Sequence, residues 1–229
     1  MKTITEIPAS EFTGKRVMVR CDFNIQVFEG KIMDDLRVRK TLPTISFLRD
    51  AGAKVLLISH NESKDGTGLR PVCEHINERY GKECGIVTFI ENFGTADARH
   101  ILESMKDGDV ALFENLRVDE REKKNDMEFA KELAALADVY VNDAFGTAHR
   151  AEATTNGVAK YAPIACAGPL MAAELDALSR ALASPKRPLV AIVAGSKVSS
   201  KLTILKALAD KVDELIVGGG IAGCSVAYH

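Results

Sequence analysis

Three absences limit what this chain of 229 residues can be. It has no Cys-x-x-Cys pair, and its five cysteines are an odd, scattered set, so neither a zinc site nor a disulfide framework is expected. It has no apolar run near the roughly 20 residues that cross a bilayer. It has no marked excess of either charge, because 30 basic and 32 acidic side chains leave a net charge of −2. No overall field then favours nucleic acid or an anionic membrane, and an anion site must be a local basic cluster.

The N-terminal residues also lack the apolar core of a signal peptide. Together with the unpaired cysteines, this favours a reducing, cytoplasmic location. Hydrophobic residues make up 46% of the chain and charged residues 27%, a balance that is typical of a folded protein with a buried core.

Strand-like and helix-like segments alternate along most of the chain, which predicts a parallel sheet covered by helices. The expected strands are residues 17–19, 55–58, 85–90, 110–113, 139–141, 189–193 and 215–217. The expected helices run from a cap at Asp34 or Asp35 to about residue 50, then over 71–80, 96–105, 126–137 and 202–208. Pro43 indicates that the first regular helix starts near it rather than before it, and Gly52 stands where a terminating glycine belongs.

The character of the sequence changes after Gly157. Leucines at 175, 178 and 182 continue a helical stripe from Met171, and two prolines follow at 185 and 188. We expect an α/β chain in three parts: a Rossmann-like three-layer parallel sheet domain over 1–170, an interdomain helix over 171–185, and an incomplete second α/β domain over 186–229. The last part is called incomplete because one strand–helix–strand unit does not cover both faces of a sheet.

Polar side chains gather where the expected strands end, and ligands of open parallel sheets bind at those ends. Guanidinium groups there match phosphate and carboxylate oxygens, while carboxylate and amide side chains suit hydroxyl groups. The pattern predicts a site for a small anion such as a phosphate. The residues are Arg20, Asp22, Asn24, His60, Glu114, Asn115, Arg117, Asn142, Asp143, His149 and Arg150.

Each arginine taken alone is explained better by an ion pair with a nearby acid such as Asp22, Asp143 or Glu114. The repeated placement at strand ends favours a ligand site for the set. For His60 and His149 the two alternatives are a phosphate contact and a neutral imidazole bonded to the backbone.

The last part of the chain carries two glycine motifs. Residues 195–201 join a strand to a helix, where backbone amides together with Lys197 and Lys201 suit phosphate groups, although the P-loop spacing is absent. Residues 218–223 match G-x-G-x-x-G, but the acid expected about 20 positions later has no counterpart in the 229 residues. A nicotinamide or flavin site is set aside for that reason.

Taken together, these segments resemble the phosphoglycerate kinase family. Residues 138–150, Asp-Val-Tyr-Val-Asn-Asp-Ala-Phe-Gly-Thr-Ala-His-Arg, are similar to the family's signature. The other matching segments, in the family's order and spacing, are 19–24, 114–117, 195–201 and 218–220. The chain corresponds to a little over half of a typical member.

The resemblance implies reversible phosphoryl transfer between 1,3-bisphosphoglycerate and ADP, giving 3-phosphoglycerate and ATP in glycolysis, with two domains closing over the substrates. It also implies a monomer and Mg²⁺ bound with ATP or ADP. Six positions match phosphoglycerate-binding residues of the family: Asp22, Asn24, Arg37, His60, Arg117 and Arg150. Arg37 and Lys201 match its catalytic positions. The nucleotide-binding positions are Lys197, Lys201, Gly218, Gly219 and Gly220.

Some positions depart from the family pattern. His-Leu-Gly-Arg-Pro reads His-Asn-Glu-Ser-Lys over 60–64, so Ser63 stands in place of an arginine, beside Glu62. His-Arg-Ala-His reads His-Arg-Ala-Glu over 149–152. The family's later glycine-rich loop and magnesium-binding aspartate are expected beyond residue 229, so little transfer is expected from this chain alone. The alternative is a phosphoglycerate-binding module without catalytic activity.

Overall fold

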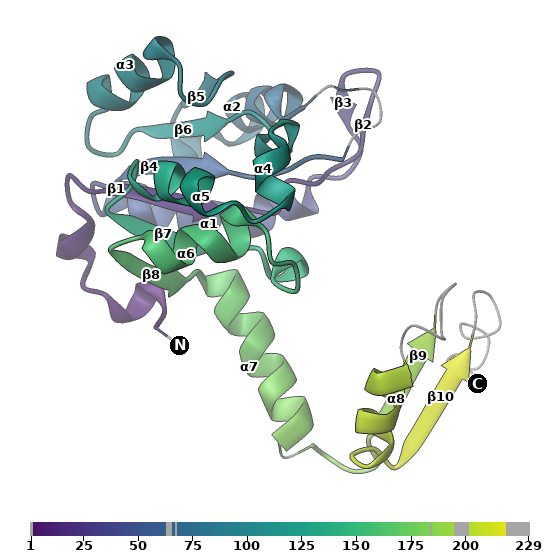
Figure 1. Cartoon of the computed structure of the whole chain (residues 1–229). Coiled ribbons are helices and arrows are strands. Elements are labelled where there is room, and N and C mark those ends of the chain that lie inside the picture. Colours follow the sequence, from purple (N-terminus) through teal and green to yellow (C-terminus); the bar gives the residue numbers. More distant parts are fainter. Residues whose placement is uncertain (1, 63–65, 67, 184, 195–201, 219–229) are drawn as a thin grey trace. The chain divides into compact units, whose positions relative to one another are not determined.

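A parallel sheet of six strands forms the centre of the first of two units in this computed structural model (Figure 1). The structure describes residues 2–62, 66, 68–183, 185–194 and 202–218. The two compact units comprise residues 1–174 and residues 175–229. The predicted domain boundaries at residues 170 and 185 stay predictions.

The strands follow one another across the sheet in the order β5-β6-β4-β1-β7-β8. From the central strand β1 the chain passes to β4 on one side, and it later returns to β7 on the other side. The strand order therefore reverses between β1 and β7. A crevice at the carboxyl ends of strands is expected at such a point. The strands are β1 (Arg16–Arg20), β4 (Lys54–Ile58), β5 (Val87–Ile90), β6 (Val110–Phe113), β7 (Val139–Asn142) and β8 (Ile164–Ala167).

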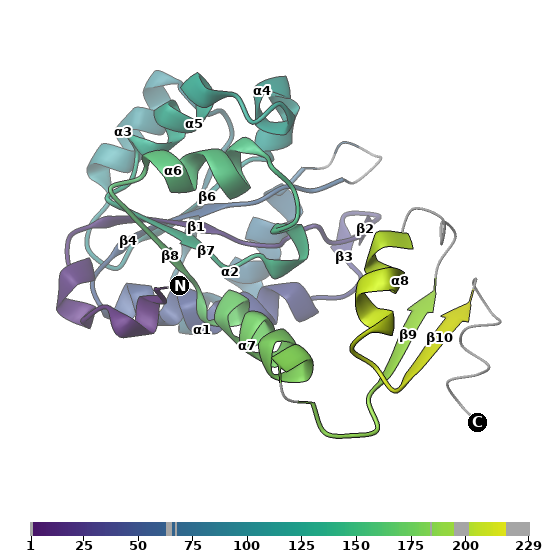
Figure 2. The same cartoon turned by 60° about the horizontal axis from the view of Figure 1, so that its bottom comes forward.

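The two faces of the sheet carry separate hydrophobic clusters. Val17 and Val19 point into one cluster, whereas Met18 points into the other. Because both faces are covered, the strands are continuous apolar runs rather than alternating ones. Helices α1 (Leu36–Asp50) and α2 (Arg70–Cys84) cover the first face, and α3 (Ala96–Ser104) and α5 (Met127–Ala134) the second (Figure 2).

Several predicted helix ends are confirmed. Asp34 Oδ1 accepts from the Leu36 amide at 2.9 Å at the start of α1, and Gly52 ends that helix with φ of +75°. Asp126 caps α5 by accepting from the Phe129 amide at 2.9 Å. These polar side chains satisfy amides that have no partner within the helix.

The prediction for Pro43 is wrong, because α1 runs through it from Leu36. Proline removes one helical hydrogen bond and costs roughly 3 kcal/mol inside a helix. Val38 and Thr41 before it, and Ile45 and Leu48 after it, are all buried. Burying both halves of the amphipathic helix offsets that local cost.

Some elements were missed. Strand β8 at the sheet edge was not expected, because its first two residues are exposed and the strand lacks a clear pattern. The hairpin of β2 (Val27–Phe28) and β3 (Lys31–Ile32) is too short to predict. The same holds for α4 (Glu120–Lys123), α6 (Val158–Tyr161) and the π-helical turn Ala153–Gly157.

Helix α7 (Pro169–Ala183) begins near the carboxyl end of β7, where Asp143 holds its first turn. Asp143 Oδ1 accepts from the Leu170 and Met171 amides at 2.9 and 3.1 Å, and Thr44 Oγ1 donates to its other oxygen. A Cβ at Gly168 would stand 2.2 Å from this carboxylate. Glycine is therefore required at 168 for so close an approach.

The second unit contains a parallel pair of strands, β9 (Val190–Ala194) and β10 (Glu214–Gly218), and helix α8 (Leu202–Ala209). Gly218 ends β10. Lys197, Lys201, Gly219 and Gly220, which the resemblance assigns to the nucleotide, lie outside the described residues. Within the described chain no helix is both long enough and apolar enough to cross a membrane.

Candidate functional site

The basic residues named from the sequence lie around His60, at the carboxyl end of β4 beside β1. His60 is 2% exposed. Its burial, and then the charges of Arg20, Arg117, Arg150 and Arg37, lower the pKa of the imidazole to about 3. The contacts give the positions directly: Arg20 hydrogen-bonds His60, Arg117 and Arg150 both contact Glu62 two residues further along, and Arg37 pairs with Asp22.

A hydrogen bond from Arg20 fixes the form of the His60 ring. Arg20 Nη2 lies 2.8 Å from His60 Nδ1, and because a guanidinium group only donates, Nδ1 accepts. The neutral ring then carries its hydrogen on Nε2. Among the described residues Nε2 makes no hydrogen bond, so His60 has an N–H left for a ligand.

Arg20 is itself held in a buried network. The side chain is fully buried, and burial lowers its pKa. Arg20 Nε donates to Thr154 Oγ1 at 3.0 Å, and Thr154 in turn donates to the buried Glu122. Burying a charge is costly unless it is paired and hydrogen-bonded. We therefore assign Arg20 to orienting His60 rather than to contacting a ligand.

Arg117 lies at the centre of a second cluster, with two acids. Its Nη2 donates to both oxygens of Glu152, at 2.6 and 2.8 Å, and its Nη1 donates to Glu62. The Arg117 side chain is only 5% exposed, and its buried Nε has no partner among the described residues. Burial works to lower the pKa of Arg117, but Glu152 and Glu62 outweigh it and raise the pKa above its ordinary value.

Glu62 joins this cluster to Arg150. Arg150 Nη1 lies 3.3 Å from the same Glu62 oxygen that Arg117 contacts. Partial burial works to raise the pKa of Glu62, but hydrogen bonds from Arg117 and Arg150 outweigh it and hold the pKa below its ordinary value. A carboxylate thus already lies between two of the arginines predicted to bind an anion.

Arg37 and Asp22 line a separate hollow beside this cluster. Arg37 Nη1 lies 2.5 Å from Asp22 Oδ1, so the alternative of a local ion pair describes Arg37 in this structure. The hollow has a volume of about 330 Å³, and Lys40 and Gly146 also line it. A Cβ at Gly146 would stand 3.0 Å from Asp22 Oδ2, which makes a residue without a side chain the best fit there.

Asn24 connects the two clusters. Its side-chain oxygen accepts from the Glu62 amide at 3.0 Å, and its own amide lies 3.4 Å from Asp22 Oδ1. The structure therefore brings all six predicted substrate-binding residues to one edge of the sheet, in two adjoining groups. Sequence reasoning missed Lys40, whose helix position gave no signal, and the orienting role of Arg20.

Other predicted polar residues have different places. Asp143 holds the start of α7, as described above. Glu114 accepts from the Leu69 amide at 2.7 Å, and no arginine among the described residues pairs with it. His149 is exposed.

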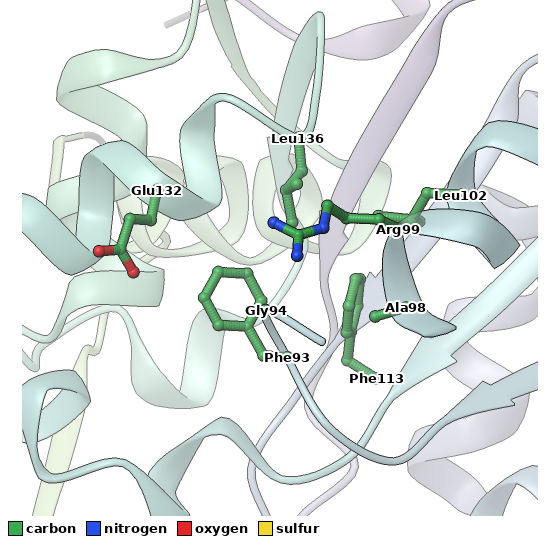
Figure 3. A pocket seen from close by; sticks show the side chains of 8 residues that line it. All are labelled: Phe93, Gly94, Ala98, Arg99, Leu102, Phe113, Glu132 and Leu136. Atoms are coloured by element: carbon green, nitrogen blue, oxygen red, sulfur yellow. The ribbon is translucent and has the colours of Figure 1, made fainter. Parts of the chain in front are cut away.

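A second hollow of similar size, about 330 Å³, opens between α3 and α5 (Figure 3). Phe93, Phe113 and Leu136 give it apolar walls, Arg99 extends between them, and Glu132 lies to one side. None of the predicted site residues is among the residues that line it. The anion site is thus distinct from this apolar hollow.

Comparisons with known proteins identify the family of this chain. The family model described as phosphoglycerate kinase matches residues 7–228. The solved phosphoglycerate kinase from Coxiella burnetii is 42% identical, with a TM-score of 0.80, and the match covers 96% of this chain and 55% of that one. The enzyme from Pyrococcus horikoshii OT3 is 31% identical, with a TM-score of 0.82 and the same two coverages, 96% and 55%.

The chain therefore spans a little over half the length of the solved structures that it matches. The family match extends over both units, from the residues before β1 to those after β10. With the fold, the strand-end arginines and this match in agreement, the chain belongs to the phosphoglycerate kinase family.

Proposed function

We propose that the strand-end site binds 3-phosphoglycerate or 1,3-bisphosphoglycerate, and that the protein transfers a phosphoryl group between 1,3-bisphosphoglycerate and ADP, forming 3-phosphoglycerate and ATP. The observation that carries the proposal is that Arg117 and Arg150 meet at one carboxylate, Glu62, two residues after His60 at the carboxyl end of β4. Because the whole chain carries a net charge of −2, this positive charge is a local cluster and not part of an overall field.

Each residue type suits one part of a phosphorylated three-carbon acid. Arg150 and Arg117 suit the oxygens of a phosphate or carboxylate, and the Nε2–H of His60 adds a donor. Asp22 and Asn24 suit a hydroxyl group. Arg37, which is exposed by 48% of its side chain at the hollow, is proposed as the catalytic arginine that meets the transferred phosphoryl group.

Phosphoryl transfer needs alignment and charge stabilisation more than a strong base. His60, with its pKa lowered to about 3, is neutral at physiological pH. It therefore serves as a hydrogen-bond donor and not as a proton carrier in this proposal. Arg37 and Lys201 would offset the negative charge that the transferred group carries in the transition state.

The nucleotide is assigned to the second unit. Lys197 and Lys201 lie in sequence between β9 and α8, and positive side chains before a helix suit phosphate groups. Gly218, Gly219 and Gly220 are proposed to line the nucleotide. Mg²⁺ bound with ATP or ADP would neutralise phosphate oxygens. No cluster of three or more potential metal ligands occurs among the described residues.

Calorimetric titration with 3-phosphoglycerate tests the binding site. We expect Arg150→Ala to weaken binding by about 1.5–3 kcal/mol, the usual value of a hydrogen bond to a charged group. Arg121→Ala is the control. Arg121 also pairs with acids, Asp119 and Glu132, but it lies away from the site. Equal affinity of Arg150→Ala and the wild type would contradict the proposed site.

A second candidate is a module that binds phosphoglycerate without transferring phosphate. The two acids on Arg117 favour it, because they neutralise charge that transfer would use. A coupled assay with 3-phosphoglycerate and Mg-ATP separates the two candidates. Turnover supports the kinase, whereas binding without turnover supports the module.

A further inference from the structure

Glu62 is a carboxylate placed where an anionic ligand is expected to bind. Arg117 Nη1 and Arg150 Nη1 both contact its Oε1 atom. Arginine pairs with carboxylates and phosphates through the same donors. A ligand carboxylate or phosphate therefore competes with Glu62 for these two arginines.

The backbone around Glu62 is held in place. Its amide donates to Asn24 Oδ1 at 3.0 Å, and Asn115 Nδ2 donates to the carbonyl of the preceding Asn61 at 2.7 Å. A group tethered in this way has a high effective concentration at its partner. The carboxylate nevertheless remains displaceable, because Glu62 is 53% exposed and makes a single contact with each arginine.

Glu152 has a different role on the same arginine. It receives two hydrogen bonds from Arg117 Nη2, and its side chain is 11% exposed. Among the described residues, Glu152 forms an ion pair with Arg117 alone. Glu152 thus holds Arg117 in position, which leaves Nη1 as the group that Glu62 and a ligand share.

We propose that Glu62 is a specificity-determining residue, a tethered carboxylate that occupies the anion position between Arg117 and Arg150 and that a ligand must displace. A ligand with one carboxylate exchanges like for like and gains little. A phosphate dianion brings more charge and more acceptor oxygens, so it displaces Glu62 more readily. The residue thus selects phosphorylated ligands over simple carboxylates, an inference that rests on the proposed function for the natural ligand.

Glu62→Gln tests this inference, because it removes the charge and keeps the size. Calorimetry would measure the affinity of the full 229-residue chain for 3-phosphoglycerate, for inorganic phosphate and for acetate. We expect Glu62→Gln to bind the two phosphates about three- to tenfold more tightly, since an exposed ion pair contributes roughly 1 kcal/mol. The preference for phosphate over acetate should fall. Glu62→Asp, which retracts the carboxylate, should give an intermediate affinity.

Glu132→Gln is the matched control. Glu132 is 49% exposed and lies 3.3 Å from an arginine, Arg121, so it reproduces the surroundings of Glu62 away from the site. Its substitution should leave all three affinities unchanged.

The outcomes separate this inference from the proposed function. If Glu62→Gln tightens phosphate binding while neither protein binds 3-phosphoglycerate, the inference stands and the proposed substrate fails. If both bind 3-phosphoglycerate and phosphate equally well, the inference is overturned and the substrate stands. Weaker binding by Glu62→Gln also overturns it, because Glu62 would then contact the ligand directly.

Discussion

At the scale of single residues, pairing decides what each charged group is able to do. Arg20 and Arg117 are buried and hold fixed partners, whereas Arg37 and Arg150 remain partly exposed with one acid each. Three of these arginines end or follow strands in the sequence and Arg37 lies on helix α1, so sequence position alone does not tell the two kinds apart. Arg20 is fully buried and orients His60, whereas Arg117 is nearly buried but keeps Nη1 on the exposed Glu62, where a ligand can replace that carboxylate. Neither the burial nor the partners are visible in the sequence alone.

The protonation of His60 is testable at this scale. Its pKa in the folded chain, about 3, is below the ordinary 6.5 of an unfolded chain, so between these values the unfolded state binds more protons. The free energy of unfolding therefore rises with pH from 3 to 6.5 on account of this residue, by at most about 1.4 kcal/mol per unit. That contribution is lost as the solution is acidified below pH 6.5.

Urea denaturation between pH 5 and 6.5 would measure this slope for the wild type and for His60→Asn, which keeps an acceptor for Arg20. We expect a shallower slope in the variant. Nuclear magnetic resonance should also show no titration of the His60 ring between pH 5 and 8. A ring that titrates near pH 6.5 would contradict the neutral form assigned here.

At the scale of elements, helix α1 shows that burial of its apolar face outweighs the helix-breaking preference of Pro43. Pro43 is exposed on α1 and leaves the Arg39 carbonyl without its helical donor. Pro43→Ala restores that donor, so we expect the free energy of unfolding to rise by about 1–2 kcal/mol, less than the full cost of proline because alanine also frees the unfolded chain.

Pro71→Ala is the control for this prediction. Pro71 lies in the first turn of α2, where its missing N–H has no helical partner in any case. Chemical denaturation should show no gain for this variant. An equal gain in the free energy of unfolding for both variants would show that the missing hydrogen bond at Pro43 is not its source.

The sequence predicts most of these elements, because buried parallel strands and amphipathic helices leave strong patterns. Edge strand β8 was not predicted, since its exposed residues mask the pattern. Pro43 gave a false signal for where the regular part of α1 begins, although the cap at Asp34 or Asp35 was predicted. In the site, strand-end positions predicted the residues that converge. They did not predict that Glu62 and Glu152 bind Arg117, because pairs 55 and 35 residues apart depend on tertiary structure.

At the scale of the whole molecule, the two units differ in how completely their strands are covered. In the first unit, β1 has a hydrogen-bonded neighbour on each side, and Val17, Met18 and Val19 are fully buried. In the second, β9 and β10 pair only with each other among the described residues. Ile192 and Val217 are about half exposed, at 50% and 49%.

This difference predicts unequal local stability. A sheet of two strands buries little apolar surface and is marginal by itself, and local opening follows the free energy of each region. We expect amides of β9 and β10 to exchange with solvent at least about a hundredfold faster than those of β1, β4 and β7, a gap of roughly 3 kcal/mol or more. Hydrogen exchange followed by mass spectrometry on the 229-residue chain measures this.

Addition of 3-phosphoglycerate supplies the control. A ligand at the β1–β7 edge stabilises the state to which it binds by mass action, so it should slow exchange in the first unit and leave β9 and β10 unchanged. If amides of the two units are equally protected from hydrogen exchange in the absence of ligand, the low burial of the second unit does not set its local stability. Slowing in β9 and β10 alone would place the ligand away from the arginine cluster.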